Sequence, residues 1–243
     1  MTTLVAIGCS HMAGCELDVV NKDSEYNRQN CFAARTAKDL GFNYYNLAIA
    51  GASNQFIHRK LVEFITTHAN DNEDYFFLVG WTSSGRMEVR YNESSLYSYE
   101  AYADFHDPKY FPLTAGTEKH IIQDTKMRKL TKFVDVLFDD VLKDNETASL
   151  IWSTQEILKN NKFKYYMINT CTNIKRNEYN SKIIDKIDLQ YFYNPEDENS
   201  SYFYYCLNKL KFKKFSSYWH HYEPAHIEYS KFLTDKIRKV YNL

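Results

Sequence analysis

An excess of charge of either sign is missing from this sequence. Its 30 Lys and Arg residues nearly balance 31 Asp and Glu residues, and the formal net charge is -1. Without a positive field to attract polyanions, nucleic acid is not an expected partner. Long hydrophobic runs are missing too, because no stretch approaches the roughly 20 apolar residues of a membrane span and no basic leader precedes the first apolar run. We expect a soluble, cytoplasmic protein without a membrane partner.

Metal-binding and disulfide patterns are also missing. The cysteines are odd in number and show neither CxxC nor Cys/His ligand spacing: Cys9, Cys15, Cys31, Cys171 and Cys206. Neither a disulfide framework nor a zinc site is indicated, which favours a reducing compartment and a protein without cofactor or metal. Gly (7) and Pro (4) are scarce, and no linker, repeat or low-complexity tract divides the chain. We therefore expect one domain over residues 1–243, long enough to bury its own core.

What the sequence does contain is an alternation of apolar runs and helical periods. Short apolar runs predict buried strands, and apolar residues recurring every three to four positions predict helices. Strands are expected at residues 3–8, 43–49, 75–81 and 163–168, and helices at residues 30–40, from 54 onward, at 128–160 and at 224–240. This order predicts a three-layer α/β/α sandwich with a mostly parallel sheet of four or five strands, the first strand central.

Two stretches depart from this alternation and are expected to be insertions. Residues 88–125 carry no sustained period, which is typical of a long excursion near an active-site mouth. Residues 171–217 are polar at first and then aromatic and basic. Such a stretch can bind nucleic acid, but in a chain that is not otherwise basic we interpret it as an amphipathic element with its lysines in water.

In open parallel sheets, reactive groups collect beyond the carboxyl ends of the strands. Gly8-Cys9-Ser10 follows the first expected strand and places a serine on a tight strand-to-helix turn. Asn46 to Gly51 follow the second. Together, the two blocks resemble the SGNH (GDSL-like) hydrolase superfamily, where the first is Gly-Asp-Ser and the second Asn-Leu-Gly-x-x-Gly. The resemblance implies that Ser10 is the nucleophile and that Gly51 donates a backbone N–H to an oxyanion.

The third block departs from the superfamily pattern. Gly-x-Asn-Asp is expected after the third strand, but this chain has Gly80-Trp81-Thr82, with Thr82 in the place of the asparagine. A hydroxyl can donate one hydrogen bond, so Thr82 is the expected third oxyanion donor. This block and Gly-Cys-Ser are similar to variants in tailed-phage SGNH proteins, for which the compartment would be the host cytoplasm.

Asn54, Trp81 and Arg86 are expected to bind substrate. Arg86 would suit an anionic group of the substrate, or it would pair with an acidic residue at the surface.

The last block lies immediately before the C-terminal helix. The superfamily has Asp-x-x-His or Asp-x-His, a short turn, and a helix opening Gly-His or Ala-His. Ala225-His226 matches that opening, and six residues earlier stands His220, the expected base, with His221 as its alternative. No aspartate stands two or three positions before His220, so a backbone carbonyl or Glu223 is expected to replace the orienting acid. A dyad of Glu223 and His226 is the remaining alternative.

These blocks imply a serine esterase or deacylase acting on a small-molecule or carbohydrate ester, with an O-acylated carbohydrate as the expected substrate. One alternative is a catalytically degenerate SGNH-fold protein that serves as a binding or virion accessory protein. A nucleotide-binding domain of flavodoxin-like topology is a further alternative, against which the missing GxGxxG and phosphate loops count.

Overall fold

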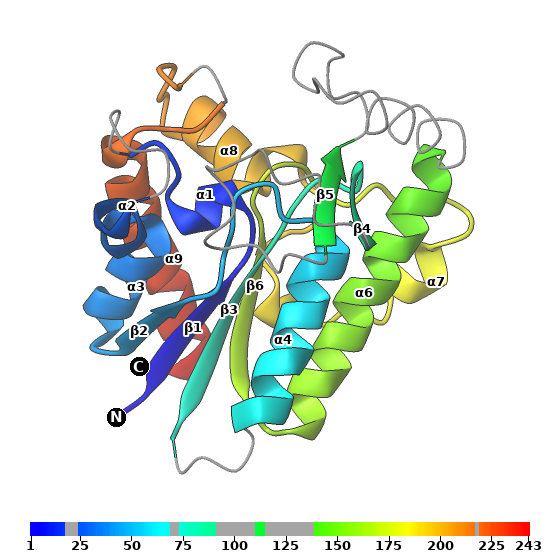
Figure 1. The fold of residues 1–243 in the computed structure, drawn as a ribbon, viewed down its shortest axis with the longest axis horizontal. Coiled ribbons are helices and arrows are strands. Elements are labelled where there is room, and N and C mark those ends of the chain that lie inside the picture. The colour runs from blue at the N-terminus through cyan, green and yellow to red at the C-terminus, as the bar shows by residue number, and fades with distance from the viewer. Residues whose placement is uncertain (18–23, 69–72, 91–109, 115–138, 217–218) are drawn as a thin grey trace.

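Four parallel strands form the central sheet in a computed structural model that describes residues 1–17, 24–68, 73–90, 110–114, 139–216 and 219–243 (Figure 1). The sheet order is β2-β1-β3-β6, so the first strand is central, as predicted. Every neighbouring pair is parallel and in continuous register. The strands are β1 (Thr3–Ile7), β2 (Asn43–Asn46), β3 (Tyr75–Trp81) and β6 (Lys164–Asn169).

Helices cover both faces of this sheet, which confirms the predicted α/β/α sandwich (Figure 1). Successive strand residues point to opposite faces. In β1, Leu4 and Ala6 therefore join the core under α3 (Phe32–Leu40) and α9 (Glu223–Tyr241). Val5 and Ile7 join the core under α4 (Asn54–His68) and α6 (Asp140–Asn160). Since β3 is buried on both faces, all its residues are buried, as its unbroken apolar sequence predicts.

Two predicted elements differ in their bounds. The helix expected at residues 30–40 is divided by Cys31, whose extended backbone ends α2 (Glu25–Asn30) and begins α3. The strand expected at residues 43–49 stops at Asn46, because the Asn46 side chain accepts a hydrogen bond from the Ala48 N–H at 2.9 Å and turns the chain.

The first expected insertion contains a small antiparallel pair, β4 (Arg86–Arg90) and β5 (Tyr110–Thr114). Residues 91–109 and 115–138 lie outside the described residues, as does the first part of the helix predicted at 128–160. The described part of that helix, α6, begins after Asp139, whose side chain accepts from the Leu142 N–H at 2.7 Å. This hydrogen bond makes Asp139 the N-cap of α6.

Residues 171–216 fold as loops and short helical turns. Tyr202 and Cys206 are buried there, whereas Lys209 and Lys211 are exposed, in agreement with an amphipathic element. None of the helices in the described residues is both long and apolar enough to cross a membrane. The remaining elements are α1 (Ser10–Ala13), α7 (Ser181–Ile184), α8 (Tyr202–Tyr204), the 3-10 turns at Leu189–Tyr191 and Glu198–Ser200, and a π-helical turn at Tyr205–Lys209.

Candidate active site

Ser10 is the first residue of α1, at the carboxyl end of the central strand β1 (Figure 1). The turn that carries it is tight: a Cβ on Gly8 would lie 2.8 Å from Met12 Cβ and 3.0 Å from the Gly80 carbonyl oxygen. Only glycine therefore allows this approach of the two strands. Within the described part of the chain, the Ser10 N–H makes no backbone hydrogen bond, as expected in the first turn of a helix. It is consequently available as a donor.

His220 contacts the Ser10 hydroxyl from the other end of the sequence. His220 Nε2 lies 2.8 Å from Ser10 Oγ, so the ring can accept the serine proton. The other candidate, His221, is fully buried and points away, with Nε2 3.1 Å from the Phe203 carbonyl oxygen. The structure thus places one histidine of the pair against Ser10 and the other in the core.

The other ring nitrogen of His220 contacts the carboxylate of Glu16. Glu16 Oε2 lies 2.6 Å from His220 Nδ1, and the Ser216 hydroxyl donates to the same carboxylate oxygen. Ser216 Oγ also accepts from the His220 backbone N–H at 3.2 Å, which ties the histidine loop to the carboxylate. The side chains of His220 and Glu16 are only 13% and 12% exposed. A hydrogen bond from Nδ1–H to a shielded carboxylate leaves Nε2 as the acceptor that general-base catalysis requires.

Sequence reasoning missed Glu16 because it examined the residues just before His220. Glu16 stands 204 residues earlier, in the turn that follows the serine helix. Gly14 ends that helix with φ 79°, and Glu16 itself is left-handed at φ 66°. Non-glycine residues rarely adopt this conformation, and at functional sites it often holds a side chain in place. A carboxylate shortly after the Gly-Cys-Ser block is the only sequence signal that was available.

The roles expected of Glu223 and His226 are corrected by the structure. Glu223 forms an ion pair with Arg35, and the carboxylate that contacts His220 is that of Glu16 instead. His226 lies in the first turn of α9, as predicted, but its Nδ1 accepts from the Phe32 N–H at 3.0 Å. Burial holds the pKa of His226 well below its ordinary value, so the ring is neutral. Glu223 and His226 therefore form no dyad.

The His11 ring packs against the His220 ring. The two rings meet edge to face, with centroids 5.0 Å apart, and His11 also contacts Tyr202 and Phe203. Burial lowers the pKa of His11 to about 3, which keeps this ring neutral. A neutral histidine ring therefore lies against His220.

The expected oxyanion residues follow β2 and β3. Gly51 adopts the left-handed region at φ 74°, and its N–H makes no backbone hydrogen bond within the described residues. Thr82 is buried, and its Oγ1 lies 3.4 Å from Cys171 Sγ. Asn54, expected to bind substrate, is instead buried and fixes Thr82: Oδ1 accepts from the Thr82 N–H at 2.9 Å, and Nδ2 donates to the Thr82 carbonyl at 3.2 Å.

The other two expected substrate-binding residues differ from one another. Trp81 is fully buried in the core, where its indole N–H lies 3.4 Å from Met167 Sδ, so the structure corrects the expectation that it contacts substrate. Arg86 interacts electrostatically with Cys9, Cys171 and His11. Its Nη1 is buried and has no hydrogen-bond partner among the described residues. A cationic side chain with an unused donor therefore lies close to the serine turn.

Comparison with solved structures finds the same fold in one esterase, and two further structures match with lower TM-scores. The psychrotrophic esterase EstA from Pseudoalteromonas sp., in a structure inhibited by monoethylphosphonate, matches with a TM-score of 0.50 and 9% sequence identity over 99% of both chains. TesA matches with a TM-score of 0.45 and 10% identity over 99% of both chains. A protein assigned to the lipolytic G-D-S-L family from Desulfitobacterium hafniense DCB-2 has a TM-score of 0.45 and 9% identity, over 97% of this chain and 99% of its own.

Sequence comparison is less informative about chemistry. No curated protein matches the sequence. A model of a family of unknown function, DUF6071, matches residues 16–203, a range that includes Glu16 but neither Ser10 nor His220.

Proposed function

The chain belongs to the family of unknown function DUF6071, and from the geometry of its site we propose that it is a serine hydrolase of carboxylic esters with the SGNH hydrolase fold. The observation that carries the proposal is the continuous contact from Ser10 Oγ to His220 Nε2 at 2.8 Å and from His220 Nδ1 to Glu16 at 2.6 Å. Nucleophile, base and orienting acid in this order are the parts that acyl transfer requires.

In the proposed reaction, Ser10 Oγ attacks the ester carbonyl carbon while His220 Nε2 takes the serine proton. Glu16 stabilises the resulting imidazolium. The tetrahedral oxyanion accepts hydrogen bonds from the N–H groups of Ser10 and Gly51, both of which lack backbone partners in the described residues. His220 then protonates the leaving alcohol, and a water molecule, deprotonated by the same ring, releases the acyl group from Ser10.

Thr82 is the proposed third oxyanion donor. It has one hydroxyl proton, and the hydroxyl makes a long contact of 3.4 Å with Cys171 Sγ. A developing oxyanion is a stronger acceptor, so the proton would turn from the sulfur to the substrate. Asn54 holds the Thr82 backbone on both sides and so defines where the hydroxyl can reach.

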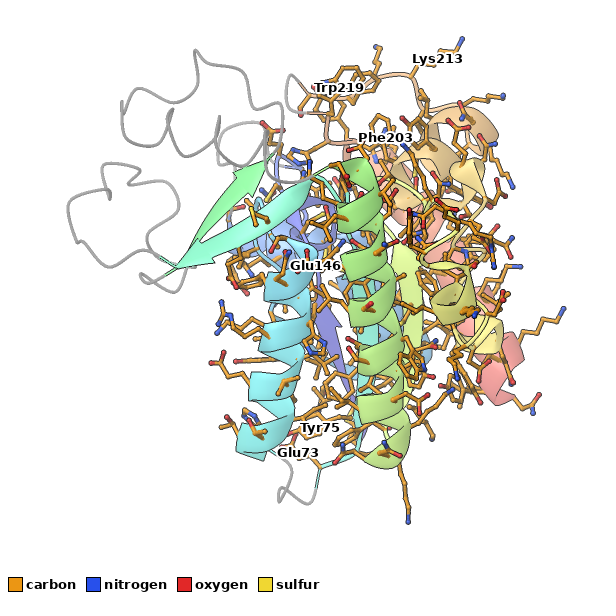
Figure 2. All side chains as sticks on the ribbon, turned by 90° about the vertical axis from the view of Figure 1, so that its right-hand side faces the viewer. Glu73, Tyr75, Glu146, Phe203, Lys213 and Trp219 are labelled. Carbon is orange, nitrogen blue, oxygen red and sulfur yellow. The ribbon has the colours of Figure 1, made fainter. Side chains whose placement is uncertain are left out.

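An O-acylated carbohydrate is the substrate class that we propose. Trp219 directly precedes His220, is 61% exposed, and stacks on Phe215 with centroids 4.9 Å apart. Figure 2 shows Trp219 and Phe203 together at one end of the molecule, opposite Tyr75 at the start of β3. Trp219 has φ 65°, a conformation that is strained for a bulky residue. An exposed aromatic face there suits the apolar face of a sugar ring.

Labelling with a fluorophosphonate tests the nucleophile without knowledge of the substrate. The wild-type protein should be labelled at Ser10, and Ser10→Ala should not be labelled. His220→Ala should label far more slowly, whereas the control Ser149→Ala, on the exposed side of α6, should label at the wild-type rate. A wild-type protein that is folded yet neither labels nor hydrolyses p-nitrophenyl acetate would reject the hydrolase and favour a binding protein on the same fold.

The substrate class is tested separately with Trp219→Ala. This variant should lose activity toward an acetylated oligosaccharide, measured as acetate release, while its hydrolysis of p-nitrophenyl acetate stays near the wild-type value. Equal losses on both substrates, or no loss on either, would contradict the role given to Trp219.

A further inference from the structure

Two cysteines from distant parts of the chain meet beside the serine turn. Cys9 directly precedes Ser10, and Cys171 follows the end of β6. Their sulfur atoms lie 3.9 Å apart, and no disulfide joins them. Thr170 Oγ1 contacts both sulfurs, at 3.2 Å from Cys9 and 3.8 Å from Cys171.

The two thiols differ in access and in acidity. Cys9 is fully buried, and burial raises its pKa to about 12. Cys171 is partly exposed, and its pKa is lowered to about 5, first by the hydrogen bond with Cys9, then by the charge of Arg86 and the Thr82 hydroxyl. Its partial exposure and the nearby Arg86 charge therefore make Cys171 the more reactive sulfur of the pair, whereas burial favours the protonated thiol at Cys9. Thiolates near a cation and open to solvent are the cysteines that react with oxidants.

We propose that Cys171 and Cys9 form a dithiol site that a hydroperoxide oxidises to a disulfide, with Cys171 as the attacking sulfur and Cys9 as the resolving one. The Cys171 thiolate attacks one peroxide oxygen, the O–O bond breaks, and the alkoxide or hydroxide leaves and takes up a proton. Cys171 is now a sulfenic acid. The Cys9 thiol attacks its sulfur, the S–O bond breaks, and water leaves. Two thiols and one peroxide thus yield one disulfide, one alcohol or water from the peroxide, and one further water.

Disulfide formation would disturb the serine turn. The sulfur atoms must approach from 3.9 Å to the bond length of about 2.05 Å. The Cys9 carbonyl accepts from the Met12 and Ala13 N–H groups at 2.9 and 3.0 Å, so a shift of Cys9 moves the start of α1 and with it Ser10. Gly8, which precedes Cys9, lies close to the Gly80 carbonyl, where there is no room even for a Cβ. We therefore expect oxidation to suppress the reactivity of Ser10. This consequence rests on the proposed hydrolase function, but formation of the disulfide does not depend on it.

The test treats the purified full-length protein with hydrogen peroxide and maps its cysteines by mass spectrometry after alkylation and digestion. The expected product is a Cys9–Cys171 cross-linked peptide that is 2 Da lighter than the two thiols, and dithiothreitol should reverse it. Cys9→Ser should instead accumulate a dimedone adduct at Cys171. Cys206→Ser, which removes a buried cysteine on the π-helical turn, should still form the cross-link.

Two readouts separate this inference from the proposed function. Fluorophosphonate labelling of Ser10 should fall at least tenfold on oxidation and return with dithiothreitol. If the protein is no hydrolase, labelling is absent throughout but the cross-link still forms. If peroxide yields neither the cross-link in the wild type nor a dimedone adduct in Cys9→Ser, while the wild type labels normally before and after treatment, the dithiol site is rejected and the hydrolase stands.

Discussion

Replacing Glu16 by glutamine should slow ester hydrolysis by about 10²- to 10⁴-fold in kcat/KM, with little change in KM. The Glu16 carboxylate lies 2.6 Å from His220 Nδ1, and both side chains are about nine-tenths shielded from water. Opposite charges about 4 Å apart attract by about 4 kcal/mol at an effective dielectric of 20. Each 1.36 kcal/mol corresponds to tenfold in rate, so losing most of this attraction in the transition state costs about 10² or more. The glutamine N–H can also donate to Nδ1, which would hold the proton on Nε2 and extend the loss toward about 10⁴.

The assay is hydrolysis of p-nitrophenyl acetate, followed for Glu16→Gln and for the matched control Glu223→Gln. Glu223 carries the same side chain and also belongs to an ion pair, but its partner is Arg35 and its side chain is 35% exposed. The control should stay within about twofold of wild type, as expected for a partly exposed pair. If Glu16→Gln keeps more than half of the wild-type kcat/KM while Ser10→Ala is inactive, Glu16 does not orient the base. An equal loss in Glu223→Gln would refute the assignment as well.

Three further changes follow from buried side chains around the site. Asn54→Ala leaves the buried Thr82 N–H unpaired and should lower the free energy of unfolding by about 1–3 kcal/mol in urea denaturation. An unchanged urea midpoint would show that the hydrogen bonds from Asn54 to the Thr82 backbone do not stabilise the fold. His226→Ala should lower stability by a similar ~1–3 kcal/mol yet keep fluorophosphonate labelling at Ser10, and loss of labelling in the folded variant would return His226 to the candidate bases. Because the pKa of His11 falls from 6.5 to about 3 on folding, below pH 6.5 the unfolded state binds a proton that the folded state does not, and stability declines as the pH falls from 6.5 toward 3. His11→Gln should remove up to about 1.4 kcal/mol per pH unit from that slope between pH 7 and pH 5; an unchanged slope would show that His11 is not buried neutral.

Local patterns in the sequence were sufficient for the fold. The apolar runs of β1 and β3 and the helical period of α9 report burial directly, since a residue that faces the core on a regular element must recur at that element's period. The order of these elements along the chain then selects a parallel sheet with helices on both faces. Ser10 and Gly51 were identifiable from the resemblance of their two sequence blocks to the SGNH superfamily, and both lie in turns at strand ends.

Tertiary structure alone decided which side chains meet. Glu16 and His220 are separated by 204 positions, and no periodicity or turn rule connects them; their contact depends on how the loop before α9 lies over the turn after α1. The same holds for the 3.9 Å distance between the sulfur atoms of Cys9 and Cys171. It also holds for Asn54, whose side chain makes hydrogen bonds to the Thr82 backbone. The sequence by itself determined the sheet, its helices and the position of the serine, because these depend on local burial and backbone geometry. The acid, the choice between His220 and His221, and the dithiol depend on the directions of side chains from distant segments, which only the folded chain specifies.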